Sequence, residues 1–278
     1  MSIVLAFASA IVFGVSDYAG GRATRHASVF VVTLFAQAAA MVCVLVLLPV
    51  LGDPFPGGDD VWWSVGAGVA SVCGGGAFYH ALANGSMTVV APFTAIVSAL
   101  LPVGVGLTIG ERPGALALGG VAVAVAAVAL VGGALERHER PTPPRILVIA
   151  ALAGVGFGLL FVCFDQTSEA SGMWPLLIAQ LISIPLVLAG AHLTGARLHL
   201  TGTTRWLAVV AGMFSAAAHI AYITATRDGL LTIVSVVASM YPASTVVLAT
   251  VVDGERIHRT QAIGLTMAVA ALALVAAG

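Results

Sequence analysis

The feature that most constrains the fold of this chain is an internal duplication. When the sequence is shifted by 144 residues, the stretch Trp206–Val275 aligns without a gap on the stretch that begins at Trp62. The aligned positions are chemically varied: Ser215 on Ser71, Tyr222 on Phe78, Gly212 on Gly68, Glu255-Arg256 on Glu111-Arg112, and Gly264 on Gly120. A constant offset over such different residues predicts that the two halves share one fold, and a repeat of this kind takes precedence over other fold assignments.

Composition decides the environment of the duplicated unit. Of 278 residues, 60% are hydrophobic and only 8% are charged, and the mean hydropathy is +1.07. Because a soluble domain carries about 25% charged residues, the chain is predicted to cross a membrane many times, with the lipid bilayer as its surroundings and no nucleic-acid partner. All eleven basic residues are Arg, and the absence of Lys excludes a Walker A nucleotide-binding loop.

Ten apolar runs are long enough to span a bilayer, which takes about 20 residues in a helix. They cover residues 2–20, 28–50, 62–83, 87–109, 114–134, 146–164, 172–194, 205–226, 230–252 and 260–278. We therefore predict an all-α membrane protein with ten transmembrane helices. Its two five-helix repeats occupy residues 1–134 and 146–278, and residues 135–145 form a polar linker.

Five helices in each half have a geometric consequence. An odd number makes the second copy enter the membrane from the opposite side, so the halves are predicted to form an inverted repeat. Secondary transporters are often built this way and bind substrate near the midplane between their repeats. The charge of the loops adds an orientation: nine Arg follow odd-numbered helices and two follow even-numbered ones, which by the positive-inside rule places both termini outside.

Polar side chains on two repeat-related helices mark a candidate cavity. In the predicted eighth helix, His219, Tyr222 and Thr226 follow one another at spacings that place them on one face. The third helix has Ser71 where the eighth has Ser215, and it continues to Tyr79 and His80. An imidazole here could line a translocation cavity or bond to a neighbouring helix, and both interpretations stay open.

Hydroxyl and amide side chains extend this candidate cavity. The ninth helix carries Ser235 and Ser239, and the fourth carries Thr94 and Ser98. A Ser or Thr can also bond to its own helix four residues earlier, which is the simpler interpretation of each one alone. Gln37 and Gln180 lie at similar depths of the second and seventh helices, where they could bind substrate or join helices.

The few acidic residues lie near helix ends. Asp17 and Asp165 are expected to line vestibules. Glu111-Arg112 and Glu255-Arg256 are interpreted as structural corners, because a Glu just before the fifth helix of each half suits the positive end of that helix. The sequence contains no recognisable catalytic residues and no spacing of metal ligands, so we expect no enzyme activity, no cofactor and no metal ion.

Several motifs resemble a known family. The fourth helix ends in Gly110-Glu111-Arg112 and is followed by a glycine-containing fifth helix. The first helix contains Phe13-Gly14-Val15-Ser16-Asp17-Tyr18. In the ninth helix, Tyr241-Pro242 lies thirteen residues before Glu255. With these motifs the chain resembles two tandem EamA domains of the drug/metabolite transporter superfamily. The first half departs from the pattern, with Ser98 in place of Pro242.

The resemblance implies a ten-helix carrier that exports or imports small metabolites, such as amino acids or drug-like compounds, and we expect an exporter in the bacterial inner membrane. It also implies cytoplasmic termini, opposite to the Arg distribution. The substrate would be a small molecule, and both a monomer and a homodimer stay open. The alternatives are a membrane-embedded enzyme acting on lipid-linked substrates, for which the sequence lacks a cluster of acids or histidines, and a membrane scaffold that transports nothing.

Overall fold

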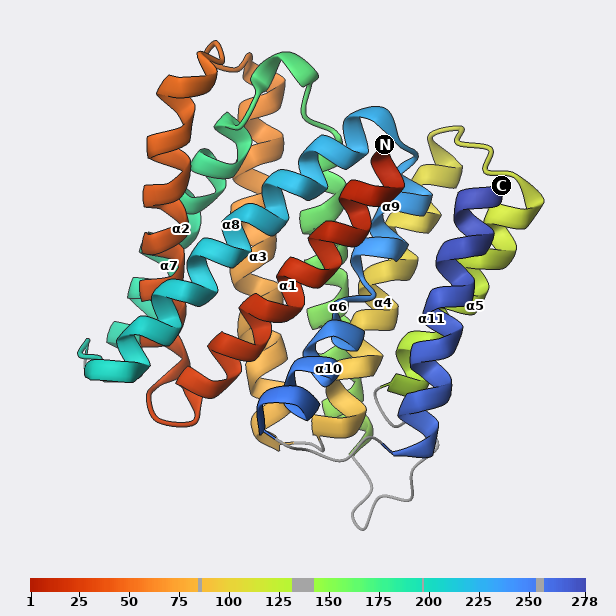
Figure 1. The fold of residues 1–278 in the computed structure, drawn as a ribbon. Helices are drawn as coiled ribbons and strands as arrows, with labels where there is room; N and C mark the ends of the chain where they lie inside the picture. Colours follow the sequence, from red (N-terminus) through yellow and green to blue (C-terminus); the bar gives the residue numbers. More distant parts are fainter. Residues whose placement is uncertain (85–86, 132–142, 197, 254–257) are drawn as a thin grey trace.

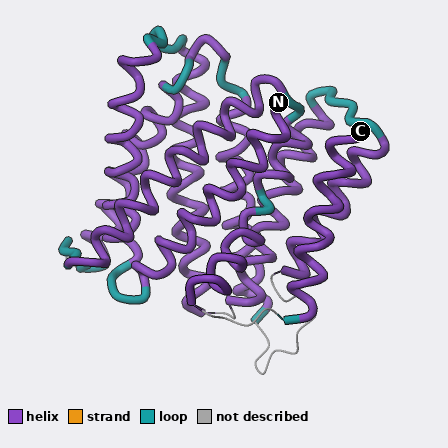
Figure 2. The backbone as a smooth tube through the Cα atoms, viewed as in Figure 1, coloured by secondary structure: helices purple, strands orange, loops and turns teal. Residues whose placement is uncertain are grey.

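The computed structural model describes residues 1–84, 87–131, 143–196, 198–253 and 258–278. The described chain is helical almost throughout, and Figure 2 shows loops but no strand within these ranges. Helices are expected here because a long apolar segment in lipid must satisfy every backbone polar group within itself. The prediction of an all-helical protein is confirmed for the described residues.

Figure 1 shows the helices arranged as one bundle, with both termini at its upper face. The helices of the first half are α1 (Ser2–Thr24), α2 (Val29–Leu51), α3 (Gly58–Asn84), α4 (Met87–Thr108) and α5 (Ala115–Val131). Those of the second half are α6 (Pro144–Asp165), the 3-10 helix η1 (Glu169–Ser171), α7 (Trp174–Leu193), α8 (Gly202–Asp228), α9 (Leu231–Ala238), α10 (Tyr241–Asp253) and α11 (Arg259–Ala277).

The expected ninth helix, residues 230–252, is wrong as a single element, because the structure divides it into α9 and α10. Pro242 has no N–H to donate to the carbonyl four residues earlier. The Ser239 hydroxyl donates to Ser235 O at 2.7 Å, and Met240 N donates to Val237 O at 3.2 Å. These bonds close the last turn of α9. Pro102 lies within α4, which continues through it, so proline alone does not explain the break.

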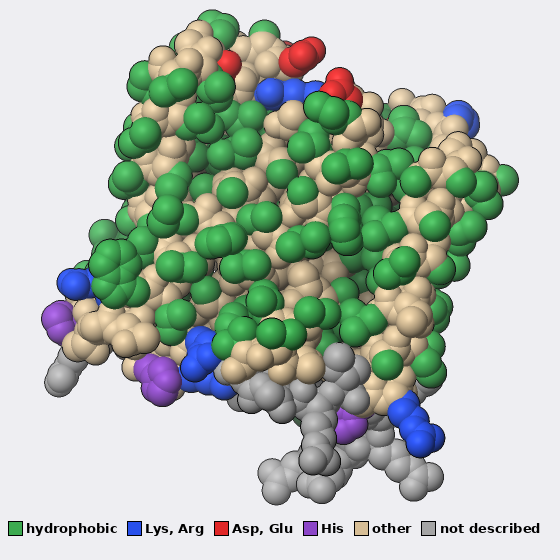
Figure 3. Space-filling view, viewed as in Figure 1, with side chains coloured by type: hydrophobic (Ala, Val, Ile, Leu, Met, Phe, Trp, Pro, Cys, Tyr) green, Lys and Arg blue, Asp and Glu red, His purple; other side chains and the backbone are tan. Residues whose placement is uncertain are grey.

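Eight segments of the described chain are long and apolar enough to cross a membrane, and one of them, Leu231–Val252, runs through both α9 and α10. Two further apolar helices are shorter, Phe93–Thr108 and Ala115–Val131. The chain is therefore a multi-span membrane protein. Its surface agrees, because Figure 3 shows hydrophobic side chains over most of one face of the bundle.

Most of the helix packing joins one half of the chain to the other. The main contacts come in pairs in which the two halves exchange roles. Helix α1 packs against α8, and α6 packs against α3, its counterpart in the other half. In the same way α2 packs on α8 and α3 on α7, while α5 lies beside α11, as Figure 1 shows at the right of the bundle. Neither half therefore forms a separate core.

Small residues allow the closest of these approaches. A Cβ added at Gly156 of α6 would lie 2.5 Å from the Cα of Gly74 in α3, so the two backbones touch there. Between α1 and α8 the hydroxyls of Ser9 and Ser16 donate to Ala218 O at 2.9 Å and to Ala211 O at 2.8 Å. Close backbone approach and polar bonds between helices are the usual contacts of helices in lipid.

Charged side chains lie at the two ends of the bundle. In Figure 3 the Asp and Glu side chains lie along the upper edge of the visible face, and His side chains lie along the lower edge. The helix bounds place Arg22, Arg25, Arg145, Arg205 and Arg259 near the lower ends, and Arg112 and Arg227 near the upper ones. We call these the basic face and the terminus-bearing face.

Candidate functional site

Aromatic rings from four helices meet between the two halves. Phe13 of α1 packs edge-on against His219 of α8, with ring centroids 4.8 Å apart and an interplanar angle of 82°. The same ring lies 6.4 Å from Phe161 of α6 and 6.3 Å from Tyr241 of α10. Since Tyr241 is the first residue of α10, this aromatic cluster lies beside the interrupted helix.

His219 makes its hydrogen bonds within its own helix. Its Nδ1 lies 2.8 Å from Ser215 O and 3.4 Å from Ser215 Oγ. A bond to a carbonyl requires a protonated Nδ1, so in the neutral ring Nε2 is left as an acceptor. The ring also packs edge-on against Phe164, 5.6 Å away. The described contacts of His219 with neighbouring helices are therefore ring contacts, not the polar bond between helices that the sequence left open.

Next to this cluster the structure brings together two predicted residues, Tyr222 and Ser235. The buried Tyr222 hydroxyl lies 2.8 Å from Ser235 Oγ and donates to Phe161 O at 3.2 Å. Its ring stacks on Phe161 at 4.6 Å with an interplanar angle of 28°. Three helices, α6, α8 and α9, are thus joined at one buried polar point.

The other predicted hydroxyls are buried and bonded to backbone carbonyls. Within their own helices the donors and acceptors are Thr226 to Ile223 O at 3.0 Å, Ser239 to Ser235 O at 2.7 Å, and Ser98 to Ala95 O at 2.9 Å. Thr94 of α4 instead donates to Ala150 O of α6 at 3.1 Å. In this conformation these groups join backbone segments.

The predicted residues of α3 do not join the aromatic cluster. Ser71 is half-buried. His80 is exposed, on the helical stripe that also carries the exposed Trp62 and Val69, so it lies on the outer side of α3. The side chain of Tyr79 lies outside the described residues.

Gln37 and Gln180 lie on α2 and α7, which pack against each other. The Oε1 atom of each is buried and has no hydrogen-bond partner among the described residues. Buried polar atoms are rarely left without a partner, so these two carbonyl oxygens remain available to a donor.

Asp17 is exposed although it lies on the inner side of α1. The lipid-facing stripe of this helix contains Val4, Phe7 and Ile11, whose exposed fractions are 72%, 40% and 43%. With 3.6 residues per turn, Asp17 points in the direction of the buried Ala6 and Ala10 instead of that stripe, one turn beyond Phe13. The exposed Asp17 side chain therefore lies on the bundle-facing side of α1, between the aromatic cluster and the basic face.

Glu111 ties the first half to the second at the terminus-bearing face. Its carboxylate accepts hydrogen bonds from Leu231 N at 2.6 Å, from Thr232 N at 2.9 Å and from the Thr232 hydroxyl. The sequence assigned Glu111 to the start of the following helix, α5. That assignment is wrong, because the structure places the carboxylate at the N-terminus of α9, in the other half of the chain. Arg112 is exposed and donates to Leu107 O at 3.3 Å.

The remaining acidic predictions fall elsewhere. Asp165 is half-buried at the end of α6 and accepts a bond from Gln166 Nε2 at 2.9 Å. It lies at the terminus-bearing end of the bundle, whereas Asp17 lies toward the basic face. Glu255 and Arg256 lie outside the described residues.

Two further carboxylates connect the halves at the terminus-bearing face. Asp60 accepts bonds from Ser168 N at 2.7 Å and Ser168 Oγ at 2.6 Å. Asp53 accepts one from Met173 N at 3.0 Å. Sequence reasoning placed these acids only in a loop between helices, because their partners lie more than a hundred residues away.

The aromatic members of the cluster were also missed by the sequence analysis. Phe161 and Phe164 were treated as part of apolar spans, and Phe13 and Tyr241 only as parts of family motifs. The one available signal was the repeat, which aligns Phe157 with Phe13. An apolar ring in an apolar helix does not reveal which side of the helix it occupies.

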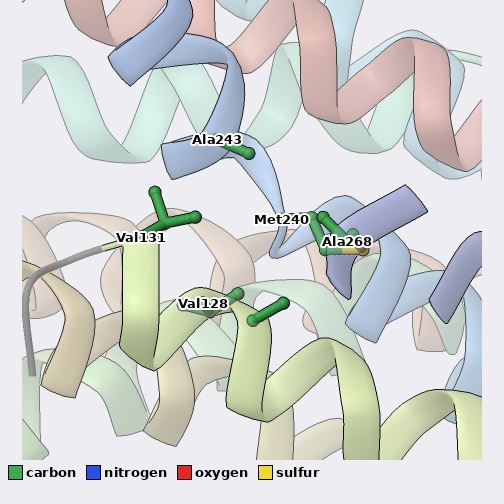
Figure 4. A pocket seen from close by; sticks show the side chains of 6 residues that line it. Val128, Val131, Met240, Ala243 and Ala268 are labelled. Carbon is green, nitrogen blue, oxygen red and sulfur yellow. The ribbon is translucent and has the colours of Figure 1, made fainter. Parts of the chain in front are cut away.

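One hollow of the described structure is lined only by apolar side chains. A shallow hollow between α5, α11 and the α9–α10 break is lined by apolar side chains, five of which Figure 4 labels: Val128, Val131, Met240, Ala243 and Ala268. In the described ranges, His, Cys, Asp and Glu side chains form no group of three or more that could hold a metal ion.

The sequence matches one known family in its second half, and the fold matches a solved structure. Residues 144–277 match the model of the EamA-like transporter family. A solved structure, described only as "Crystal structure of protein", has a TM-score of 0.78 and 18% sequence identity, covering 99% of this chain and 98% of that one. At this identity the likeness shows the fold alone. No curated protein matches the sequence.

Proposed function

Because residues 144–277 of this chain match the model of the EamA-like transporter family, we propose that the protein is a secondary transporter that exports small metabolites, such as amino acids or drug-like compounds. The observation that carries this proposal is the aromatic cluster of Phe13, Phe161, His219 and Tyr241 beside the break between α9 and α10. Interrupted helices at the boundary between two halves are where transporters of this kind bind their substrates.

We further propose that residues 1–134 and 146–278 are two inverted five-helix units joined by residues 135–145, with α9 and α10 together forming one crossing. The 144-residue offset supports this arrangement. So does the exchanged packing, in which α1 contacts α8 as α6 contacts α3. A two-fold axis in the membrane plane produces such reciprocal pairs, and we place the protein in the plasma membrane of a bacterium.

Alternating access would then expose the aromatic cluster to one side of the membrane at a time. The terminus-bearing face is crossed by the bonds of Asp53, Asp60 and Glu111 between the halves. Toward the basic face, by contrast, the inner side of α1 exposes Asp17. These observations support a conformation that is closed at the terminus-bearing face and open at the basic one.

The chemistry of the cluster favours a small substrate with both an apolar and a polar part. Rings from Phe13, Phe161 and Tyr241 can pack on an apolar or aromatic group, and His219 Nε2 can accept a hydrogen bond from an amine or hydroxyl. All of these side chains come from a single chain, so one copy provides the proposed site.

The test begins with a metabolite-wide efflux screen on cells that overexpress or lack the protein. Each positive compound is then measured by counterflow into liposomes that contain purified protein. We expect His219→Ala to reduce counterflow by about tenfold, the effect of losing one hydrogen bond of roughly 1.4 kcal/mol. The control is His192→Ala, because His192 is exposed at the end of α7.

The outcomes separate the alternatives. Normal counterflow per folded molecule in His219→Ala would remove the cluster from the proposed site. A screen without any transported compound, joined to turnover of a lipid-linked substrate, would favour a membrane enzyme. If no compound is transported and none is converted, the scaffold interpretation is favoured.

A further inference from the structure

The carboxylate of Glu111 connects the two halves of the chain. It follows α4 in the first half, and all three of its described acceptor bonds are to the first two residues of α9 in the second half. Leu230, which precedes α9, provides no side-chain cap of its own. The anion therefore supplies the N-terminal cap that α9 lacks, where the helix dipole favours negative charge.

The approach of the two halves at this point depends on Gly106. A Cβ at that position would collide with the Glu111 carboxylate and the Thr232 hydroxyl. The backbone of Gly106 also accepts a bond from Glu111 N at 2.9 Å. The Glu111 backbone is thus bonded to the end of α4, and its carboxylate is bonded to the start of α9.

Helix α9 connects this contact to the aromatic cluster. It is only eight residues long, and a helix of two turns moves as a unit. Glu111 binds its first turn, and Ser235, in its second turn, bonds to Tyr222 at 2.8 Å. A displacement of α9 at one end therefore changes the contact at the other.

We propose that Glu111 is the latch between the two halves, a positioning residue that holds α9 in place while the terminus-bearing face is closed. Opening of that face separates Glu111 from Leu231 and Thr232 and moves Ser235 relative to Tyr222. This inference rests on the proposed alternating access.

The experiment measures conformation without any substrate. Cys43, Cys73 and Cys163 are replaced to give a cysteine-free protein, and one reporter is added at a time. Thr226→Cys reports on the terminus-bearing face, because Thr226 is buried on the side of α8 that carries Tyr222, one turn nearer that face. Asp17→Cys reports on the interior toward the basic face. Labelling rates with a water-soluble maleimide are measured on purified protein in detergent.

We expect Glu111→Gln and Glu111→Ala to accelerate labelling at Thr226→Cys by about tenfold, since bonds to a charged group are among the stronger ones. Labelling at Asp17→Cys should slow in the same proteins, because closure of one side accompanies opening of the other. Thr232→Val, which removes only the hydroxyl, should produce a smaller change in the same directions. The matched control is Asp59→Asn, an exposed acid on the same face, for which both rates should stay unchanged.

Three results would overturn the latch. Rates at Thr226→Cys within about twofold of the parent in every Glu111 variant would show that the contact does not control opening. Acceleration at both reporters would indicate general loosening instead of a coupled movement. An effect of Asp59→Asn equal to that of Glu111→Gln would indicate surface charge alone.

If Glu111→Ala does not fold, Glu111→Gln and Thr232→Val carry the test. If no substrate is ever transported but the reporters respond as expected, the latch stands and the transport assignment fails.

Discussion

At the scale of the residue, the most telling contact is the one between Tyr222 and Ser235. A hydroxyl on a membrane helix can bond to its own backbone, and Ser98, Ser239 and Thr226 do so. Tyr222 instead bonds to a side chain of α9 and to a carbonyl of α6. The hydroxyls of Tyr222 and Ser235 therefore join different helices, whereas those of Ser98, Ser239 and Thr226 stabilise their own turns.

A double-mutant cycle measures this contact. We expect Tyr222→Phe and Ser235→Ala each to lower the free energy of unfolding, and their combination to cost less than the sum. The coupling should be about 0.6 kcal/mol, the average for hydrogen bonds between membrane helices. Reversible unfolding in mixed micelles gives the four values, and purely additive losses would mean that the 2.8 Å contact contributes nothing.

At the scale of the element, close packing of α3 and α6 depends on the absence of side chains where they touch. Gly74 and Gly156 meet there, while a Cβ at Gly75 or Gly76 would find nothing within 4 Å. Neighbouring glycines in one helix therefore differ in role, although the sequence presents them as one run.

We accordingly expect Gly156→Val to lower the free energy of unfolding by roughly 1–3 kcal/mol, the usual cost of overpacking. The control is Gly76→Ala, which should leave stability unchanged or raise it slightly, because Ala favours helix over Gly. Thermal unfolding of both purified variants checks this. Equal stabilities would contradict the close contact between α3 and α6.

At the scale of the whole molecule, the described carboxylate bonds between the halves lie at one face. Asp53, Asp60 and Glu111 all bridge the halves at the terminus-bearing face, and the exposed inner carboxylate, Asp17, lies toward the opposite one. This asymmetry is a property of neither half alone, because each bridging acid lies in the first half and each partner in the second.

Sidedness of labelling tests this asymmetry. In sealed vesicles of known orientation, we expect Asp17→Cys to react with an impermeant maleimide added on the side that labels Arg25→Cys, the exposed end of α1. Reagent added on the side that labels Asp59→Cys should leave it unmodified. Reaction of Asp17→Cys from both sides at equal rates would contradict a closed terminus-bearing face.

The sequence by itself determined the membrane environment, the helical class and the approximate limits of most helices. The physical reason is that lipid requires long apolar segments with internally bonded backbones, and such segments are visible as composition. The 144-residue offset likewise predicted that corresponding helices would exist in both halves. These are local or periodic properties, and they need no knowledge of neighbours.

Only the tertiary structure decided which side chains meet. Glu111 looked like a cap for the next helix and proved to cap α9, 120 residues further along the chain. Phe13 was only the first residue of a family motif in the sequence, and its ring proved to contact both His219 and Tyr241. The ninth span looked continuous and proved to be divided at Ser239 and Met240. In the first two cases the deciding contact comes from another helix, and the sequence does not record which helix that will be.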